Sequence, residues 1–307
     1  MDIAVTGSTG LIGRRLVADL RTAGHRVLGV VRPSSSSATG DTISWDPAVG
    51  TIDAGGFEGL DAVVHLAGEG IAEKRWTDDQ KRRILESRTQ GTGLLARTLA
   101  GLQKPPTVLL SGSAVGYYGD TGDRVTDESG PAGRDFPAMV CVAWEDAATP
   151  AVEAGLRVAF LRTGIVLSTD GGALAKQLPA FKLGLGGRAG KGTQFQSWIS
   201  IDDEVGAIIH LLGAGTGGVG AGAAVSGPVN LTAPDPVTNA EFTKALGAAL
   251  HRPTTILPMF GPRLLFGREL ADSLLLTSQR VVPTALEASG YSFRHPDIEG
   301  ALRALLT

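Results

Sequence analysis

Cysteine is nearly absent from this sequence, in which Cys141 is the one thiol among 307 residues. A single thiol excludes an internal disulfide framework and a cysteine-based metal cluster, and it suits a reducing compartment. No apolar run approaches the ~20 residues of a membrane-spanning helix. The first residues, MDIAVTGSTG, lack the basic start and long apolar stretch of a signal peptide. We therefore expect a cytoplasmic protein with no membrane partner and no metal site.

An excess of charge of either sign is also missing. Lys and Arg number 28 against 31 Asp and Glu, which gives a net charge of -3 and a pI near 6.0. This balance gives no reason to expect a nucleic-acid partner. Hydrophobic residues make up 43% of the chain, enough for a large core in one domain or two closely joined ones. The expected partner is a small-molecule substrate, bound by a monomer or a homodimer.

Strand-length runs of Val, Ile and Leu alternate with helix-length stretches through the first half of the chain. The runs are IAVTG, HRVLGVVR, DAVVHLAG, PTVLLSGSA and LRVAFLRTGIVL. This alternation predicts an α/β fold, a Rossmann-like doubly wound parallel sheet covered on both faces. Residues 139–155 are expected to form one helix. Residues 201–212 are expected to form another, with a favourable aspartate at its start.

After about residue 168 the pattern becomes glycine-rich and irregular. A helix at 201–212 and a strand in GPVNLTAP then return to the sheet, and the remaining tail is helical with proline breaks. We expect residues 1–170 and 199–233 to form the sheet domain. Residues 171–198 and 234–307 are expected to form a smaller, mainly helical second lobe.

A glycine-rich turn joins the first predicted strand to the first predicted helix. In VTGSTGLIG the turn contains Gly7, Thr9, Gly10, Leu11, Ile12 and Gly13. Glycine permits a tight turn and a close approach of a pyrophosphate, whose charge meets free N–H groups at the helix N-terminus. The strand–turn–helix context therefore predicts a dinucleotide site. The alternative is a turn with a structural role alone.

The end of the second strand indicates which dinucleotide binds. Sites for NAD commonly carry an acidic residue here, whereas this chain has Arg32, which can pair with a 2′-phosphate. Ser34 or Ser35 can add hydroxyl donors. NADP(H) is therefore favoured over NAD(H), and the alternative is that Arg32 is a solvated surface residue.

The third strand of the alternation ends in small residues. Leu66, Ala67 and Gly68 follow His65 in HLAGEGI, where they would bring the backbone close to the cofactor. Gly68 could instead merely end the strand. We expect His65 to be a packed strand residue and not a catalyst.

Short motifs continue along nearly the whole chain. They include TGSTGLIG, WDP, HLAGEGI, RWT, SR, SAVGYYG, WE, LRTGIVLS, GLGG, SWI, LTAP, QRVVP and GYSF. Together these motifs resemble the short-chain dehydrogenase/reductase superfamily in its extended, epimerase/dehydratase-like form. Within that form they resemble the atypical branch called "epimerase family protein", which carries a small C-terminal domain. The resemblance implies a Rossmann-like fold and a nicotinamide cofactor, and it implies no particular substrate because fold is weak support for a reaction.

The resemblance also shows what this chain lacks. Standard members carry a Tyr and a Lys at i and i+4 on the helix after the fourth strand, and the Lys lowers the Tyr pKa and holds the nicotinamide ribose. Alignment on Glu145 puts Pro137 at the Tyr position and Cys141 at the Lys position. Because its flanking residues are apolar, Cys141 is expected to be a buried residue and not a nucleophile.

The serine of standard members is retained as Ser113, and Tyr117 and Tyr118 follow on the loop that borders the nicotinamide in relatives. A tyrosine without a lysine neighbour stays protonated at neutral pH, so it can donate a proton but is a poor base. Ser113, Tyr117 and Tyr118 are the candidate catalytic residues. The alternative is that both tyrosines are packing residues.

In relatives, the stretch that here reads LRTGIVLS passes the nicotinamide carboxamide. The resemblance therefore implies cofactor contacts through the backbone groups of Thr163, Gly164 and Val166, with Arg162 structural. A basic, glycine-rich segment follows, in which Lys182, Arg188 and Lys191 could clamp a nucleotide-sugar diphosphate. A solvated loop is the expected reading of that segment.

Three functions follow from these observations. The leading hypothesis is an NADP(H)-dependent oxidoreductase, reductase-like, with a small organic carbonyl-type substrate. The first alternative is a nucleotide-sugar epimerase or dehydratase. The second alternative is a catalytically silent protein that senses NADP(H) by binding it.

Overall fold

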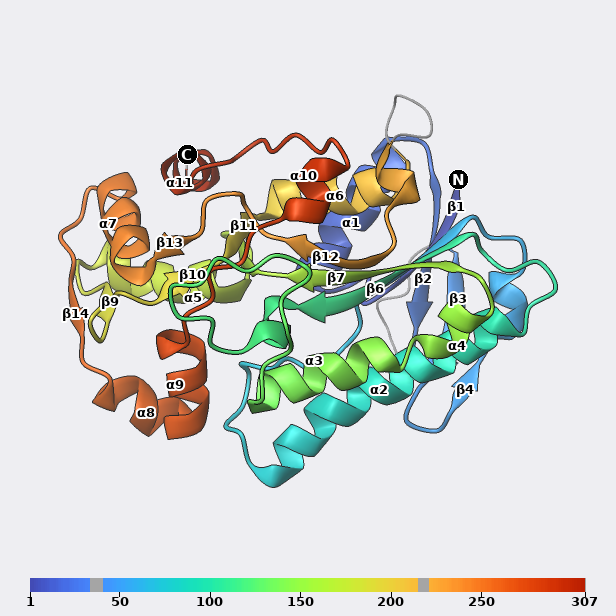
Figure 1. Ribbon diagram of the computed structural model, residues 1–307, viewed down its shortest axis with the longest axis horizontal. Helices are drawn as coiled ribbons and strands as arrows, with labels where there is room; N and C mark the ends of the chain where they lie inside the picture. Colours follow the sequence, from blue (N-terminus) through green and yellow to red (C-terminus); the bar gives the residue numbers. More distant parts are fainter. Residues whose placement is uncertain (34–40, 215–220, 307) are drawn as a thin grey trace.

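The computed structural model describes residues 1–33, 41–214 and 221–306. Within these residues, an eight-stranded sheet lies at the centre of the protein. The spatial order of the strands is β12-β7-β6-β5-β1-β2-β3-β4 (Figure 1). Their bounds are Asp2–Thr6 (β1), Arg26–Val31 (β2), Thr42–Asp46 (β3), Thr51–Ile52 (β4), Ala62–His65 (β5), Val108–Ala114 (β6), Arg157–Thr163 (β7) and Gly227–Leu231 (β12). All neighbouring pairs are parallel except β3 with β4. The predicted Rossmann-like α/β fold is confirmed.

The strand order reverses beside β1. From β1 the chain runs outward through β2 and β3, and it then crosses to β5, β6 and β7 on the other side. In open parallel sheets, ligands bind at this switch point, beyond the carboxyl ends of the strands. Thr6 at the end of β1 lies opposite His65 at the end of β5. The glycine-rich turn after Thr6 therefore opens onto the switch point.

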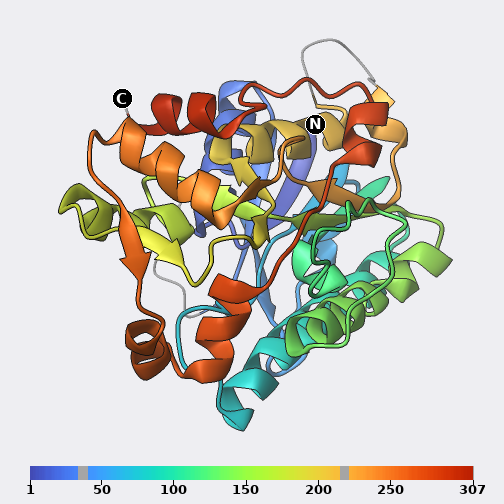
Figure 2. The ribbon, with the colours of Figure 1, turned by 60° about the vertical axis from the view of Figure 1, so that its left-hand side comes forward.

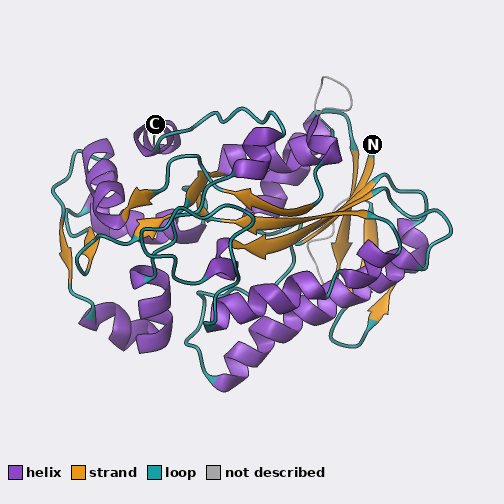
Figure 3. Cartoon of the chain, in the orientation of Figure 1, coloured by secondary structure: helices purple, strands orange, loops and turns teal. Residues whose placement is uncertain are grey.

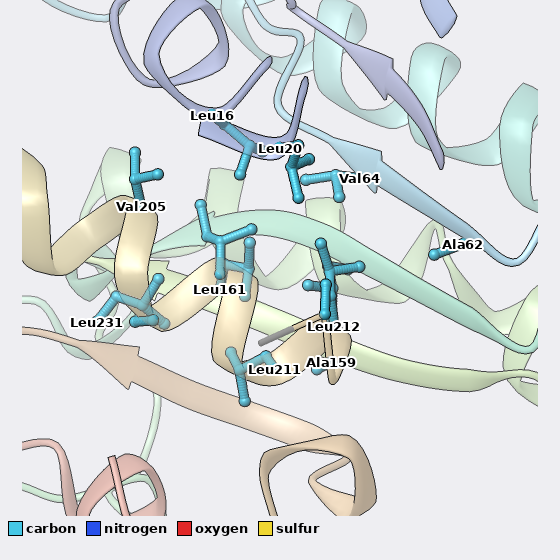
Figure 4. Packing of buried hydrophobic residues seen from close by; sticks show 14 of the residues in the cluster. Leu16, Leu20, Ala62, Val64, Ala159, Leu161, Val205, Leu211, Leu212 and Leu231 are labelled. Atoms are coloured by element: carbon cyan, nitrogen blue, oxygen red, sulfur yellow. The ribbon is translucent and has the colours of Figure 1, made fainter. Parts of the chain in front are cut away.

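Helices cover both faces of the sheet (Figures 1 and 2). One face carries α1 (Leu11–Thr22) and α6 (Ile201–Leu212), and the other carries α2 (Asp78–Ala100), α3 (Phe136–Asp146) and α4 (Thr149–Glu153). Leu16 and Leu20 of α1 and Val205 of α6 share one core with Leu161 of β7 (Figure 4). Full burial of such a side chain contributes about 1.5–3 kcal/mol. This packing holds α1, and with it the glycine-rich turn, against the sheet.

Two local details differ from the sequence-based expectations. Residues 139–155 form two helices, α3 and α4, because Pro150 lies in the first turn of α4. Proline has no N–H to donate and suits only the start of a helix. The N-cap of α6 is Ser200 and not an aspartate. The Ser200 hydroxyl accepts a hydrogen bond from the Asp203 N–H. Asp203 is fully buried and accepts hydrogen bonds from the backbone N–H groups of Arg294 and His295.

A second lobe packs at one end of the sheet, and helices dominate it (Figure 3). Its helices are α5 (Gly172–Lys182), α7 (Asn239–Ala249), α8 (Phe260–Phe266), α9 (Arg268–Leu276) and α11 (Ile298–Leu306). Short strand pairs join them: β8 (Ile165–Leu167) with β11 (Trp198–Ser200), β9 (Gly187–Ala189) with β14 (Thr255–Leu257), and β10 (Phe195–Gln196) with β13 (Val237–Thr238). Its core contains Leu174, Phe181, Trp198, Phe242 and Leu302.

The C-terminal segment does not stay in the second lobe throughout. Helix α10 (Thr284–Ala288) packs against β12, and Leu286 belongs to the core of the sheet domain. Tyr291 and Phe293 pack against the same core. This differs from the expected placement of residues 234–307 wholly in the second lobe. The described residues also contain three 3-10 helices: Ala54–Phe57 (η1), Val115–Tyr118 (η2) and Ala221–Ala224 (η3).

None of the helices in the described ranges is both long enough and apolar enough to cross a lipid bilayer.

Candidate cofactor and active site

The glycine-rich turn fits closely against the end of β5. Gly7 has φ +65°, and a Cβ there would lie 2.8 Å from the carbonyl carbon of Leu66. A Cβ on Gly13 would lie 2.2 Å from the Gly7 carbonyl oxygen. Both positions therefore require glycine, the first for its backbone and the second for helix–strand packing. Gly10 differs, because its φ is -73° and its Cβ would meet only the Gly7 carbonyl oxygen, at 3.2 Å.

The N-terminus of α1 is prepared for an anion. No side chain caps it, and no acidic residue stands in its first turn. The unpaired N–H groups and the helix dipole therefore favour a negative group at this position. The cradle of Gly7, Gly10 and Gly13 leaves the backbone open to such a group, so the residues present fit a dinucleotide pyrophosphate.

Two cavities meet at Gly7. The larger, of about 800 Å³, is lined by residues that include Gly7, Ser8, Thr9, Arg32, Trp45, Asp46, Ala67, Gly68, Arg83 and Ser87. The smaller, of about 310 Å³, is lined by residues that include Gly7, Gly10, Leu11, Ile12, Gly13, Leu66, Val166 and Gly172. We call them the adenosine-side cleft and the helix-side hollow. The cofactor residues predicted from the sequence line one or the other, except Thr163 and Gly164.

Thr163 and Gly164 line neither cavity, and each has close contacts within the protein. The Thr163 hydroxyl donates to Oε1 of Glu204 at 2.9 Å. A Cβ on Gly164 would lie 2.6 Å from the Ser197 carbonyl oxygen, so the glycine allows β8 to start beside β11. Glu204 is fully buried, and burial raises the pKa of its carboxyl to about 8. Its Oε2 atom has no hydrogen-bond partner among the described residues.

Arg32 lies exposed at the mouth of the adenosine-side cleft, just beyond β2. Sequence reasoning missed four other charged residues that line this cleft. They are Asp46 at the end of β3, Glu69 after β5, and Arg83 and Glu86 on α2. The signal for Asp46 was the WDP motif, whereas Arg83 is one of several charges on a polar helix and had no distinguishing signal. Ser34 and Ser35 lie outside the described residues.

A hydroxyl–imidazole chain supports the floor of the cleft. The Thr6 hydroxyl accepts hydrogen bonds from the N–H groups of Leu66 and Ala67, each at 3.1 Å. Its proton therefore points to Nδ1 of His65 at 2.7 Å, and the imidazole donates from Nε2 to Thr92 at 2.9 Å. Burial, assisted by the charge of Arg88, lowers the pKa of His65 to about 4. The neutral ring therefore holds the end of β5 in place and is not exposed to the cleft.

Ser113 belongs to a second, buried polar network. Its hydroxyl donates to Oε1 of Glu145 at 2.6 Å, and Glu145 forms a two-point ion pair with Arg162. Arg162 also donates to the Tyr118 hydroxyl at 2.9 Å, and that hydroxyl donates to Asn230 at 2.7 Å. Ser113 and Arg162 are almost fully buried. The network ties β6, β7, β12 and α3 together.

The two candidate tyrosines have different environments. Tyr118 is 2% exposed, burial raises the pKa of its hydroxyl to about 12, and both hydrogen-bonding roles of that hydroxyl are filled by protein. Its expected role as a proton donor to substrate is therefore corrected to a structural one. Tyr117 is half-buried, and the Arg162 guanidinium stacks 3.4 Å from its ring centre. None of Ser113, Tyr117 and Tyr118 lines the cleft or the hollow.

Cys141 is a buried thiol. It is 4% exposed, and burial, with the charge of Glu145, raises its pKa to about 12. A thiol of this kind is neither a nucleophile nor a general base at neutral pH. Its sulfur would lie 3.7 Å from a Cβ on Gly116, so it fills space beside η2.

Pro137, at the expected tyrosine position, lines a third cavity between the two lobes. This inter-lobe cavity, of about 300 Å³, is lined by Trp76, Asp120, Asp135, Phe136, Pro137, Glu269, Asp272, Ser273, Leu276 and Thr277. Lys81 and Arg263 pair with Glu269 and Asp272, so Asp120 and Asp135 carry its unbalanced negative charge. The basic residues Lys182, Arg188 and Lys191 line none of the three cavities. Lys182 ends α5 and Arg188 lies in β9, so these two do not belong to a loop.

The sheet, the glycine cradle and the cleft together define a dinucleotide-binding protein with a Rossmann-like fold. Comparison with family models gives two matches: the NAD dependent epimerase/dehydratase family over residues 3–223, and a domain of unknown function (DUF1731) over residues 257–305. An "Epimerase family protein" of Mycobacterium bovis is 46% identical over 301 residues, which cover 98% of this chain and 96% of the relative. The chain therefore belongs to the NAD-dependent epimerase/dehydratase family, as its motifs predict.

Solved structures agree with this assignment. The crystal structure of the human epimerase family protein SDR39U1 with NADPH has a TM-score of 0.87 and 35% identity, covering 99% of each chain. The structure of a nucleoside-diphosphate sugar epimerase from Corynebacterium glutamicum has a TM-score of 0.79 and 40% identity, covering 100% of this chain and 58% of that one. The predicted atypical branch with a C-terminal domain is confirmed.

Proposed function

We propose that this protein is an NADP(H)-dependent reductase of a small, uncharged organic carbonyl compound. The glycine cradle, the free N-terminus of α1 and Arg32 at the adenosine-side cleft support the cofactor. A human relative that is 35% identical was crystallised with NADPH, which supports the same choice. When bound, NADPH supplies a hydride.

The observation that carries the substrate class is the lining of the inter-lobe cavity. It adjoins Pro137, the position where relatives place the substrate-facing tyrosine. Four carboxylates line it, and two of them, Asp120 and Asp135, form no ion pair within the described residues. A nucleotide diphosphate would bring two further negative charges to this surface, and like charges at close range repel. A neutral carbonyl compound avoids this repulsion, and the Trp76 and Phe136 rings offer it an apolar wall.

The phenol chemistry of Tyr117 favours reduction over oxidation, although Tyr117 lines none of the three cavities. A phenol that remains protonated can donate a proton to a developing alkoxide but cannot remove one from an alcohol. Tyr117 is the candidate donor, because it is half-buried and its hydroxyl forms no hydrogen bond within the described residues. Ser113 holds Glu145 in place, which in turn holds Arg162 against the Tyr117 ring.

The test follows NADPH oxidation with a panel of neutral aldehydes and ketones, and it follows the sugar products with a panel of nucleotide sugars, because epimerisation and dehydration consume no NADPH. We expect turnover with at least one neutral carbonyl compound and none with the nucleotide sugars. Tyr117→Phe should lower that turnover by 10²–10⁴-fold, with the NADPH affinity retained. Turnover of a nucleotide sugar alone would contradict the proposed substrate class, in favour of the epimerase alternative.

A second candidate is a protein that binds NADP(H) without turnover. The burial of Ser113 and Tyr118 favours it, because these two of the three predicted catalytic hydroxyls are committed to protein partners. Tight NADPH binding with no turnover across the panel would support this candidate over the reductase.

A further inference from the structure

Arg88, from the middle of α2, places a partly buried cation beside the position where relatives have their lysine. Arg88 faces the part of α3 that carries Cys141, because its guanidinium carbon lies 4.8 Å from the ring centre of Trp144, three residues after Cys141. Arg88 and Cys141 come from facing helices, since α2 packs against α3. The cation missing from α3 at position 141 is thus present in space and comes from α2.

The guanidinium has a defined place. Its Nη1 group donates to the carbonyl oxygens of Glu69 at 2.9 Å and Ile84 at 3.1 Å, and its central carbon lies 4.8 Å from the ring centre of Trp144. A Cβ on Gly68 would lie 3.3 Å from that carbon. Gly68 lines the adenosine-side cleft. Glycine at this position therefore lets the guanidinium approach the wall of the cleft.

The charge of Arg88 is opposed by one carboxylate, that of Glu69, which lies beyond ion-pair distance. Across residues 1–33, 41–214 and 221–306, no carboxylate forms an ion pair with it, and its Nε and Nη2 groups donate no hydrogen bond. Burial lowers its pKa from the ordinary value, although arginine remains charged at any pH a protein tolerates. The unused Nε and Nη2 atoms are not sealed in the interior, so a ligand can reach them. Arg162, which meets Glu145 directly, shows the contrasting arrangement.

We propose that Arg88 is the residue that binds the nicotinamide-side ribose of NADP(H), in place of the lysine that this chain lacks. Ribose hydroxyls are neutral acceptors, so they would satisfy the unused Nε and Nη2 donors without requiring a carboxylate. Cys141 is small and buried because the space and the charge at this place are supplied from α2. Arg88 is a positioning residue for the cofactor, and this inference rests on the NADP(H) binding proposed above.

The test compares a whole cofactor with its adenosine half. Binding of NADPH and of 2′,5′-ADP is measured by calorimetry for the wild type, Arg88→Gln and Arg32→Ala. Arg88→Gln should weaken NADPH binding roughly ten- to hundredfold, the value of a charge-assisted hydrogen bond, and should leave 2′,5′-ADP binding within about twofold. Arg32→Ala should weaken both ligands, because its expected contact is the 2′-phosphate that they share.

Two further variants separate a positioning role from a structural one. Arg88→Lys keeps the charge and much of the stem, so it should recover part of the lost NADPH affinity. Adding Cys141→Lys to Arg88→Gln returns a cation to the usual place and should also restore NADPH binding. The 2′,5′-ADP titration reports in each case whether the cleft is still folded.

Several outcomes would overturn the inference. The inference fails if the Arg88→Gln variant binds NADPH as tightly as the wild type does. It also fails if this variant loses equal affinity for NADPH and 2′,5′-ADP. A loss that neither lysine variant repairs would assign Arg88 to the fold alone. In all three cases the proposal that the protein binds NADP(H) still holds if the wild type binds 2′,5′-ADP and NADPH. A wild type that binds neither ligand would reject both that proposal and the role of Arg88.

Discussion

Glu145 and Arg162 form a two-point ion pair in the interior, with Nε–Oε1 and Nη2–Oε2 distances of 2.8 and 2.9 Å. Their side chains are only 11% and 4% exposed. The pair joins α3 to β7, and its remaining hydrogen-bonding groups hold Ser113 and Tyr118. The motif residues Ser113, Glu145 and Arg162, which lie far apart in the sequence, therefore form one unit.

Breaking this pair should destabilise the protein strongly. Removal of one partner leaves an uncompensated buried charge, which costs about 3–5 kcal/mol. Glu145→Gln should therefore lower the free energy of unfolding by an amount of this order in a urea titration. Arg26→Gln, which removes an exposed pair with Asp2 and Asp41, is the control and should change little. Similar small losses from both substitutions would contradict the structural role of the buried pair.

The cofactor preference should depend on Arg32. We expect the wild type to bind NADPH more tightly than NADH, and Arg32→Ala to lose roughly ten- to hundredfold in NADPH affinity. The affinity for NADH should stay nearly unchanged, because NADH has no 2′-phosphate. Arg14→Ala, an exposed arginine on α1 outside both cofactor cavities, is the matched control. Equal wild-type affinities for the two dinucleotides would reject this prediction.

Gly10 and Gly13 should respond differently to substitution. Gly10 has an ordinary backbone conformation with little around it, so Gly10→Val should fold and yet lose NADPH binding because its side chain occupies the pyrophosphate site. Gly13→Ala should fail to fold stably, since its Cβ would lie 2.2 Å from the Gly7 carbonyl oxygen. Circular dichroism melting and NADPH fluorescence measure the two effects. Normal NADPH binding by Gly10→Val would show that the turn has a structural role alone.

Glu204 should make stability fall as the pH rises. The folded state keeps its carboxyl protonated up to about pH 8, whereas an unfolded chain releases this proton near 4.5. Between these values the folded state binds more protons, so its stability decreases with increasing pH. Glu204→Gln keeps a neutral side chain that can accept from Thr163, and it should flatten the decrease between pH 5 and 8. Urea titrations at several pH values test this, and an unchanged slope would rule out the buried carboxyl as its source.

Substitution of the two adjacent tyrosines should have different effects, on stability for Tyr118 and on turnover for Tyr117. Tyr118→Phe removes the buried hydrogen bonds that the hydroxyl forms with Asn230 Oδ1 and Arg162 Nη1, so it should cost about 1–3 kcal/mol of stability. Tyr117→Phe should leave stability nearly unchanged and reduce the turnover proposed above. Cys141→Ala serves as the control for this region, and we expect it to keep most cofactor binding and activity. Activity that tracks Cys141 would contradict the proposed chemistry.

Much of the fold and of the cofactor site follows from local sequence patterns. The glycine spacing after the first strand specifies a turn, because backbone conformation and the room for a Cβ are local properties. Alternating apolar runs likewise predict a parallel sheet covered on both faces, since burial on both sides leaves a continuous apolar strand. The absence of the usual lysine was visible at Cys141 for the same reason, once Glu145 gave the alignment.

Other features depend on which distant segments meet. Tyr117 and Tyr118 are neighbours in the chain, yet only Tyr118 reaches Asn230, 112 residues away. Arg88 and Arg162 look alike in the sequence, but packing gives Arg162 an ion-paired carboxylate, whereas Arg88 forms no ion pair among the described residues. Local pattern constrains backbone shape and burial, whereas the partner of a polar side chain depends on long-range packing that no short window of sequence contains.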